Sequence, residues 1–389
     1  MIHPTDHIFH HTPDSLARWC KDRGWPAFRA KQVLEWVYDK RTTNPHNMTN
    51  LPAAAREQLA AEMTFLSAEV KAHQLATDGT QKLLLQWWKG DTPDTPDAPR
   101  DPLAGTLASS LPVLNSPNTT IDYSGGGGGD PSRQTECVMI PTETRKTACI
   151  SSQVGCPVGC RFCASGLGGL DGNLSAGRIV EQVYRLNLLE GVGRISNIVF
   201  MGMGEPLANL KNTTHAVRTI AADWALGISA RKITISTVGL PQAINKLADS
   251  LDLPVTLALS LHAPNDELRR RLIPWADYTT IDQLLQACDA WFKKTGREIT
   301  LEYILLGGVN DQPEHAEQLA AVAKRLRANI NLIRYNEVAG LPWNRPKSQA
   351  VHDFQTTLRK QGLNAHIRAS RGRDIAAACG QLRHETANA

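Results

Sequence analysis

The spacing of apolar residues changes twice along this 389-residue chain. In residues 28–38, apolar side chains recur with the i, i+3, i+4, i+7 spacing that gathers them on one face of a helix. The surrounding segment, residues 13–65, has the same helical and compact character. Residues 66–90 contain instead the run Lys-Leu-Leu-Leu-Gln-Trp-Trp at 82–88, which is typical of a strand. The pattern therefore predicts a small helical domain followed by strands.

From residue 136 onward, strand-like runs alternate with helical stretches such as 175–189. The seven predicted strands are short and mainly apolar, and they cover residues 146–151, 195–201, 232–237, 254–261, 298–305, 331–335 and 365–369. Repeated β–α units of this kind predict an α/β fold with a parallel sheet, either doubly wound or rolled toward a barrel. Several of the strands are followed by polar residues, at the end where barrel strands bind ligands.

Residues 91–135 differ in composition from the rest of the chain. They contain seven Pro and six Gly, and Tyr123 is their one aromatic residue. Such a segment cannot supply a packed core, so its composition predicts a flexible insertion. It carries a net charge of −4, whereas the whole chain carries +4, so the remainder is more basic than the overall charge suggests.

These changes divide the chain into three parts. We expect an N-terminal helical accessory domain at 1–65, linking strands with the insertion at 66–135, and an α/β core at 136–389. No run approaches eighteen apolar residues, which excludes a membrane span, and no secretory signal is visible. We therefore expect a cytoplasmic protein, in which the eight cysteines do not form a disulfide framework.

Three of the cysteines form a compact motif. Cys156, Cys160 and Cys163 have the spacing C-x3-C-x2-C and follow the first predicted strand of the core. Three thiolates on one loop can bind three irons of a [4Fe–4S] cluster and leave the fourth iron for a chelating substrate. Thiolates also bind zinc, so a zinc site completed by Cys149 or a distant His is the alternative.

The cysteine motif, followed after the next strand by Gly204-Glu205, resembles that of the radical SAM superfamily. This resemblance implies a partial TIM-type (β/α) barrel and a [4Fe–4S] cluster whose open iron binds S-adenosylmethionine. An electron from such a cluster breaks the S–C5′ bond and yields a 5′-deoxyadenosyl radical, which the protein directs.

Two further stretches narrow the resemblance. Residues 149–156 and 372–382 are similar to the two signatures of the dual-specificity RNA adenine-C2 methyltransferases, which act on 23S rRNA and tRNA. The related C8 methyltransferases of rRNA are the nearest alternative. The similarity covers nearly the whole chain apart from the insertion and the C-terminal tail.

The resemblance implies a role for three more residues. Cys379 would take a methyl group from one S-adenosylmethionine, and a second S-adenosylmethionine would supply the radical that activates this methyl group for addition to adenine. Cys149 would then release the product by attacking sulfur, which forms a disulfide. Glu136, thirteen residues before Cys149, would be the general base.

The resemblance also implies the pocket for S-adenosylmethionine. Gly204 and Glu205 belong near its methionine amino group. The rest of the implied pocket is Ser236, Ser260, Leu261, His262 and Asn336. Cys20, Cys137 and Cys288 receive no role.

Binding partners follow from the resemblance and from charge. Besides 23S rRNA and tRNA, we expect a low-potential electron donor of the flavodoxin or ferredoxin type and a thiol reductant. Two arginine-containing stretches, 269–271 and 368–373, are candidates to pair with RNA phosphates. We expect a monomer.

Three other functions stay open at this point. A C8 methyltransferase would share every catalytic residue. A radical enzyme for a small molecule or a glycyl-radical protein would have no use for the Cys149 and Cys379 pair. A zinc-binding RNA module would need no iron–sulfur cluster.

Overall fold

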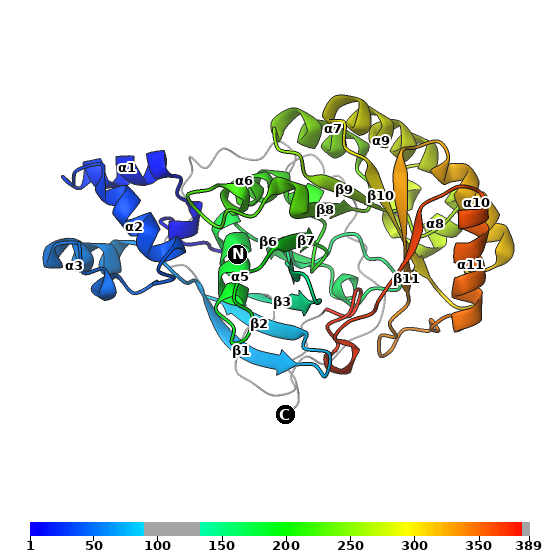
Figure 1. Cartoon of the computed structure of the whole chain (residues 1–389), viewed down its shortest axis with the longest axis horizontal. Coiled ribbons are helices and arrows are strands. Elements are labelled where there is room, and N and C mark those ends of the chain that lie inside the picture. Colours follow the sequence, from blue (N-terminus) through cyan, green and yellow to red (C-terminus); the bar gives the residue numbers. More distant parts are fainter. Residues whose placement is uncertain (89–132, 383–389) are drawn as a thin grey trace.

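A ten-stranded sheet organises the protein, and its strand order is β1-β2-β3-β4-β7-β8-β9-β10-β11-β12. The computed structural model describes residues 1–88 and 133–382. Figure 1 shows helices α7, α9, α10 and α11 along the outer side of the strands, and α1–α3 as a lobe at one end of the molecule. A separate two-stranded sheet, β5-β6, is inserted between β4 and β7 in the sequence.

The strands are β1 (Ala68–Leu75), β2 (Gln81–Trp87), β3 (Gln134–Pro141), β4 (Lys146–Cys149), β5 (Gln153–Gly155), β6 (Leu170–Asn173), β7 (Asn197–Phe200), β8 (Ile233–Thr237), β9 (Thr256–Ser260), β10 (Ile299–Leu305), β11 (Ala328–Arg334) and β12 (Ala365–Arg368). The helices are α1 (Pro13–Asp22), α2 (Arg29–Tyr38), α3 (Ala53–Glu62), α5 (Ala176–Asn187), α6 (Leu210–Ala221), α7 (Pro241–Ser250), α8 (Asp266–Leu272), α9 (Ile281–Thr295), α10 (Pro313–Ala323) and α11 (Ser348–Lys360).

The parallel half of the sheet contains the seven strands that the sequence predicts. In the large sheet each strand from β4 onward pairs in parallel with its neighbour, in the order β4, β7, β8, β9, β10, β11 and β12. Helices connect these strands. Because neighbours in the sheet follow chain order without a reversal, the doubly wound alternative is wrong and the predicted partial barrel is confirmed. No helix in the described part of the chain is long and apolar enough to cross a membrane.

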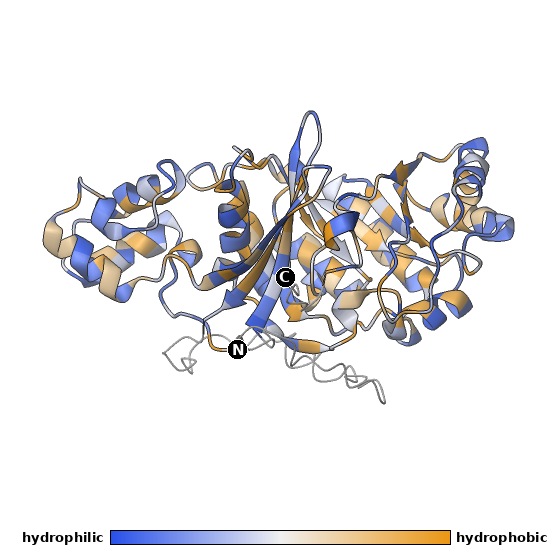
Figure 2. Cartoon of the chain, turned by 90° about the horizontal axis from the view of Figure 1, so that it is seen from below, coloured by the Kyte–Doolittle hydropathy of each residue, from blue (hydrophilic) through white to orange (hydrophobic). Residues whose placement is uncertain are grey.

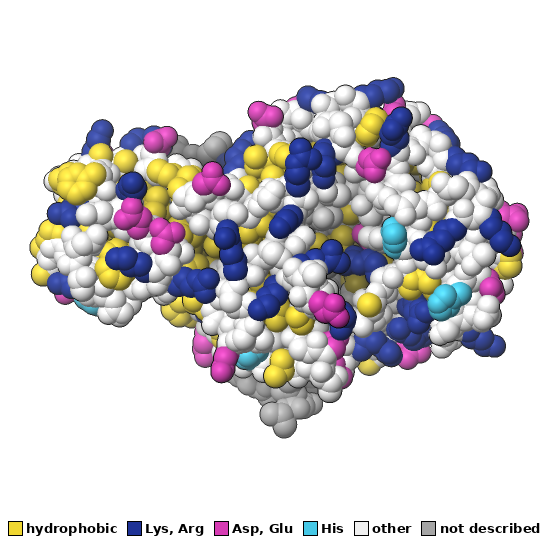
Figure 3. Space-filling model, viewed as in Figure 1, with side chains coloured by type: hydrophobic (Ala, Val, Ile, Leu, Met, Phe, Trp, Pro, Cys, Tyr) yellow, Lys and Arg dark blue, Asp and Glu magenta, His cyan; other side chains and the backbone are white. Residues whose placement is uncertain are grey.

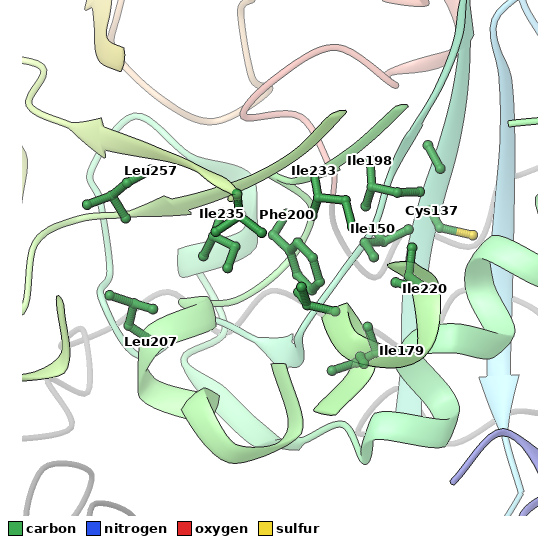
Figure 4. Close-up of a cluster of buried hydrophobic side chains, with 14 of the residues drawn as sticks. Cys137, Ile150, Ile179, Ile198, Phe200, Leu207, Ile220, Ile233, Ile235 and Leu257 are labelled. Atoms are coloured by element: carbon green, nitrogen blue, oxygen red, sulfur yellow. The ribbon is translucent and has the colours of Figure 1, made fainter. Parts of the chain in front are cut away.

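Apolar side chains fill the space between the barrel strands and their helices. Figure 4 shows isoleucines from β7 and β8 pointing toward Ile179 of α5 and Ile220 of α6, with Phe200 between them. Burial of such side chains is the main stabilising contribution to the fold, at roughly 1.5–3 kcal/mol for each large residue. The helices thereby fix the positions of the barrel strands and of their carboxyl ends.

An antiparallel extension, β1-β2-β3, joins the barrel through β4. Strand β3 begins at Gln134, so the insertion predicted at 91–135 ends too late, and its last two residues belong to the sheet. Both side chains are buried, because β3 is covered in this region on both faces. Most of the predicted insertion, 91–132, lies outside the described residues.

The N-terminal helices share a continuous core with the barrel. The Phe9 and Tyr184 rings lie 4.9 Å apart, and the Tyr38 and Trp224 rings lie 5.9 Å apart. Figure 2 shows apolar residues, in orange, in the strands and on the inner sides of helices, including those of the N-terminal lobe. The lobe is therefore docked through apolar side chains.

Glu181 of α5 forms a buried polar hub between the N-terminal segment and the barrel. Its carboxylate lies 3.0 Å from His7 Nε2 and accepts hydrogen bonds from the Ser67 amide at 2.8 Å and from Arg185 Nε at 2.8 Å. Burial opposes ionisation of Glu181, but these donors outweigh it and lower the pKa of the carboxyl group. The Glu181 carboxylate thus gives these buried hydrogen-bond donors an acceptor that they would otherwise lack.

Replacing Glu181 by Ala should lower the free energy of unfolding by about 3–5 kcal/mol, because it leaves buried donors and the Arg185 guanidinium without their acceptor. Urea denaturation followed by circular dichroism measures the effect. Glu143→Ala is the control, since exposed Glu143 should contribute less than about 0.5 kcal/mol. Equal stability of the two variants would contradict this account of the hub.

Candidate active site

A pocket opens at the carboxyl ends of the barrel strands and encloses about 880 Å³, counting the part open to solvent. Among the residues singled out by sequence, those that line it are Cys156, Cys160, Cys163, Gly204, Glu205, Ser236, Ser260, His262 and Cys379. The segments that meet here are as much as two hundred residues apart in the chain.

The cysteine motif lies in the connection between β5 and β6, one short strand later than the sequence suggests. Burial raises the pKa of all three thiols. At Cys160 the Arg269 guanidinium opposes this shift. The loop is joined to the C-terminal residues 371–382, here called the cysteine segment, because the Ala164 amide donates to the Gly380 carbonyl at 2.8 Å.

The thiols of this loop suit an iron–sulfur cluster. All three face one pocket, and soft thiolates are the donors that such clusters use. In the described part of the chain, no three His, Cys, Asp or Glu side chains converge closely enough for a single metal ion. A cluster places each thiolate on a different iron, whereas a zinc site gathers all its ligands around one ion.

Two glycines bring the loop after β7 against the strand ends. At Gly204, with φ +102°, a Cβ atom would lie 2.6 Å from Gln153 Cβ, and at Gly202 it would lie 2.7 Å from the Ile150 carbonyl. Glu205 follows, and its carboxylate accepts hydrogen bonds from the Leu207 amide at 3.0 Å and the Val238 amide at 2.8 Å. Burial raises the pKa of Glu205 to about 7. Its carboxylate thus joins the loops after β7 and β8.

Polar groups from β8, β9 and the following loop line the opposite side. Ser236 Oγ and Ser260 Oγ lie 3.1 Å apart. His262 Nδ1 accepts a hydrogen bond from the Ile304 amide at 3.1 Å, and burial lowers the pKa of His262 to about 3. The imidazole is therefore neutral with its proton on Nε2, and it can act only as a hydrogen-bond donor at that atom.

Two of the implied pocket residues do not belong to the lining. Leu261 is fully buried, and its amide donates to the Glu302 carbonyl at 3.1 Å. Asn336 donates from Nδ2 to the Cys379 carbonyl at 3.3 Å and accepts from Arg345 at 3.0 Å. In this structure, then, Asn336 supports the cysteine segment.

Cys149 belongs to a small apolar cluster that also contains Ala377, two residues before Cys379, and Cys379 lies close enough to contribute to the raised pKa of Cys149. Cys149, at the end of β4, packs with Val138, Met203, Ala377 and Leu382. Burial raises the pKa of Cys149 to about 12. Cys379 is exposed as a residue, but the protein atoms around its thiol desolvate it and raise its pKa to about 11, and the Arg368 guanidinium opposes both shifts. All eight cysteines of the chain lie in the described residues as free thiols, so the structure contains no disulfide.

Glu136 lies inside β3 and is buried, beside the same apolar cluster. Its carboxylate forms an ion pair with Lys82 of β2, with Nζ and Oε1 2.7 Å apart. Sequence reasoning missed Lys82, although a lysine inside an otherwise buried strand is itself a signal for a paired charge. It also missed Glu302, which lines the pocket and lies 3.5 Å from Arg368.

The arginine stretches divide between the interior and the surface. Arg269 is buried and donates to the Val238 carbonyl at 2.6 Å, so its predicted contact with RNA is wrong. Arg270 and Arg271 are exposed on α8. Figure 3 shows Lys and Arg side chains distributed over one face of the molecule, several of them around a hollow near its middle. A basic face of this kind suits a polyanion.

A partial barrel with three cysteines at the mouth defines a radical SAM enzyme, and comparisons agree. The radical SAM superfamily matches residues 150–320, and the ribosomal RNA large subunit methyltransferase N-terminal domain matches residues 7–65. The crystal structure of a radical SAM methyltransferase from Sphaerobacter thermophilus superimposes with a TM-score of 0.84 at 35% identity, covering 98% of this chain and 100% of that one.

Two full-length relatives narrow the class of radical SAM enzyme. A probable dual-specificity RNA methyltransferase RlmN from Rhodopirellula baltica is 41% identical over 97% of this chain and 91% of its own length. Another, from Thermosynechococcus vestitus, is 40% identical over 95% of both chains. The chain belongs to the RlmN family of dual-specificity RNA methyltransferases, which the sequence signatures predicted.

The raised thiol pKa predicts how Cys379 responds to pH. Because only the thiolate reacts and the pKa is about 11, alkylation of Cys379 by iodoacetamide should accelerate about tenfold per pH unit between about pH 7 and 9. Peptide mass spectrometry measures the rate. Arg368→Gln should slow it at every pH by raising the pKa further, whereas Arg270→Gln on the surface of α8 should not. An alkylation rate that does not change with pH across this range would contradict the raised pKa of Cys379.

The cysteine loop predicts an iron–sulfur centre. Anaerobic reconstitution should give broad visible absorbance and about four irons per chain, and Cys160→Ser should abolish both by removing one ligand. Cys288→Ala, a buried change in α9, serves as the control and should keep the absorbance. Stoichiometric zinc without visible absorbance would favour the zinc alternative instead.

Proposed function

We propose that this enzyme methylates C2 of an adenosine in 23S rRNA and in tRNA through a methyl-cysteine intermediate, and that it uses two S-adenosylmethionine molecules per turnover. The observation that supports this proposal is the placement of Cys379. It lines the same pocket as the three loop cysteines, while residues beside it pack against Cys149. A radical enzyme for a small molecule has no need for such a pair.

The pocket lining supports binding of the cofactors. The thiolates of Cys156, Cys160 and Cys163 would hold the [4Fe–4S] cluster, and the strand-end residues from Gly204 to His262 would surround S-adenosylmethionine. When bound, the cluster supplies the electron for reductive cleavage of S-adenosylmethionine, which generates a carbon radical. The apolar lining from Phe200, Ile304 and Ile333 limits access of water to this chemistry.

The two remaining site cysteines carry the methyl group and release it. The Cys379 thiolate displaces the methyl group from S-adenosylmethionine, and S-adenosylhomocysteine leaves. The 5′-deoxyadenosyl radical would take a hydrogen atom from this S-methyl group, and the resulting carbon radical would bond to adenine C2. The adduct then loses its C2 proton to a base and one electron, which the oxidised cluster would accept. The Cys149 thiolate attacks the Cys379 sulfur, and the electrons of the carbon–sulfur bond pass to the methylene carbon, which takes up a proton to become the new methyl group. An external thiol reduces the resulting disulfide.

Proton removal from the adenine carbon requires a base, and Glu136 is our candidate. Its carboxylate is buried next to the cluster that contains Cys149 and forms an ion pair with Lys82. A carboxylate that is ionised in a buried position can accept a proton without first losing one.

RNA must present a single flipped base to the pocket, since the target carbon has to reach Cys379 in its lining. The nearby cations Arg373 and Arg334, together with burial, lower the pKa of Arg345, so three guanidinium groups gather beside the cysteine segment. We assign them to RNA phosphates, and we assign residues 1–65 to an accessory domain that holds RNA. A flavodoxin or ferredoxin type of donor and a thiol reductant complete the set of partners of a monomeric, cytoplasmic enzyme.

The proposed function predicts a covalent trap. Cys149→Ala removes the resolving thiol, so after anaerobic turnover with a 23S rRNA fragment a protein–RNA adduct should accumulate at Cys379. Gel shift and peptide mass spectrometry detect it. Cys137→Ala, a buried change on β3, is the control and should turn over without an adduct.

The wild-type product separates C2 from C8 methylation. Digestion of the RNA to nucleosides and NMR should identify 2-methyladenosine. If 8-methyladenosine is the sole product, the C8 alternative replaces our proposal. Absence of any adduct in Cys149→Ala, with full methylation, would refute the methyl-cysteine route.

A further inference from the structure

The hairpin of β1 and β2 holds the cysteine segment from one side. The Thr77 amide donates to Asp374 Oδ2 at 2.8 Å, and the Gly372 amide donates to Asp78 Oδ2 at 3.0 Å. At Gly372, where φ is +63°, a Cβ atom would lie 2.8 Å from Thr80 Cγ2. The hairpin tip therefore fits closely against a segment that lies almost three hundred residues later in the chain.

Lys82, near the start of β2, connects this contact to the interior of the site. Its ammonium lies 2.7 Å from Glu136 Oε1 and donates to the Ala376 carbonyl at 3.3 Å. Ala376 precedes Cys379 by three residues and has a left-handed backbone, with φ +49°. One cation thus contacts both the carboxylate proposed as base and the segment that carries the proposed methyl carrier.

The two side chains of the Lys82–Glu136 ion pair are both buried. The side chain of Lys82 is 8% exposed and that of Glu136 is 2% exposed, so bulk water cannot replace either partner. A lysine is kept in such a place only when its charge is compensated. The ion pair with Glu136 compensates the charge, and the bond to Ala376 extends the pair to a second catalytic element.

We propose that Lys82 is a positioning residue of the methyl-transfer reaction. Its ammonium holds the Glu136 carboxylate and the backbone of the cysteine segment at a fixed separation, so that proton removal occurs beside Cys379. Lys82 acts through these two groups and does not touch substrate. The inference rests on the proposed function for the roles of Glu136 and Cys379.

The first test needs no RNA. Lys82→Met keeps the aliphatic stem and removes the charge, so backbone amides within 372–379 should exchange with deuterium about tenfold faster than in the wild type. Lys82→Arg, which restores a cation, should recover part of the protection. Lys71→Met is the matched control, because Lys71 pairs with Glu69 on the more exposed face of β1. Unchanged exchange in Lys82→Met overturns the proposal.

The second test separates positioning from simple stabilisation. Methyl transfer to Cys379 does not require Glu136 to remove the adenine proton, so in Lys82→Met it should fall less than about tenfold, whereas RNA methylation should fall about hundredfold. Lys82→Arg should recover at least about a tenth of the wild-type RNA methylation. If Lys82→Met loses methyl transfer to Cys379, RNA methylation and bound iron to the same extent, then Lys82 only stabilises the fold, and the proposal is overturned.

The two proposals fail in different ways. Failure of the wild-type protein to methylate RNA overturns the proposed function, and it is observed without any variant. The exchange measurement on Lys82→Met and Lys82→Arg reports on the positioning contact in either case.

Discussion

A thiol acts as a nucleophile or as a cluster ligand only after it loses its proton, and the interior of this barrel opposes that loss. Burial raises the pKa of Cys149 and of the three loop cysteines, and desolvation by neighbouring protein atoms raises that of Cys379, although this residue is exposed. The protein offsets this effect with guanidinium groups. Arg368 acts on Cys149 and Cys379, and Arg269 acts on Cys160. The placement of these cations is the condition on which the site depends.

The buried Arg269 and the partly exposed Arg368 both need acceptors of their own, and the barrel supplies them at its strand ends. Arg269 donates to the carbonyls of Val238 and Leu261, and Arg368 lies against Glu302. Carboxylates play the opposite part, because Glu205 joins two loops through their amides while Glu181 joins the N-terminal segment to α5. Charged side chains thus hold together the loops that apolar packing leaves free.

Much of the fold could be predicted because it depends on patterns of neighbouring residues in the sequence. Apolar runs at regular spacing gave the seven parallel strands, and the C-x3-C-x2-C motif gave the cysteine loop. Strand β3 was not among the predicted strands, because its first residues, Gln134 and Thr135, are polar residues that are buried only through sheet pairing. Lys82 and Glu302 were missed for a related reason, since their partners come from other strands and no spacing along the chain reveals them.

The cysteine segment has one more consequence, which concerns the order in which the chain is made. Its contacts to the cysteine loop, Ala164 to Gly380 and Ser165 to Leu382, depend on residues that leave the ribosome after every barrel strand. The barrel strands and the loop that holds the thiols are complete before these contacts can form. During synthesis the pocket therefore passes through a stage without its Cys379 wall.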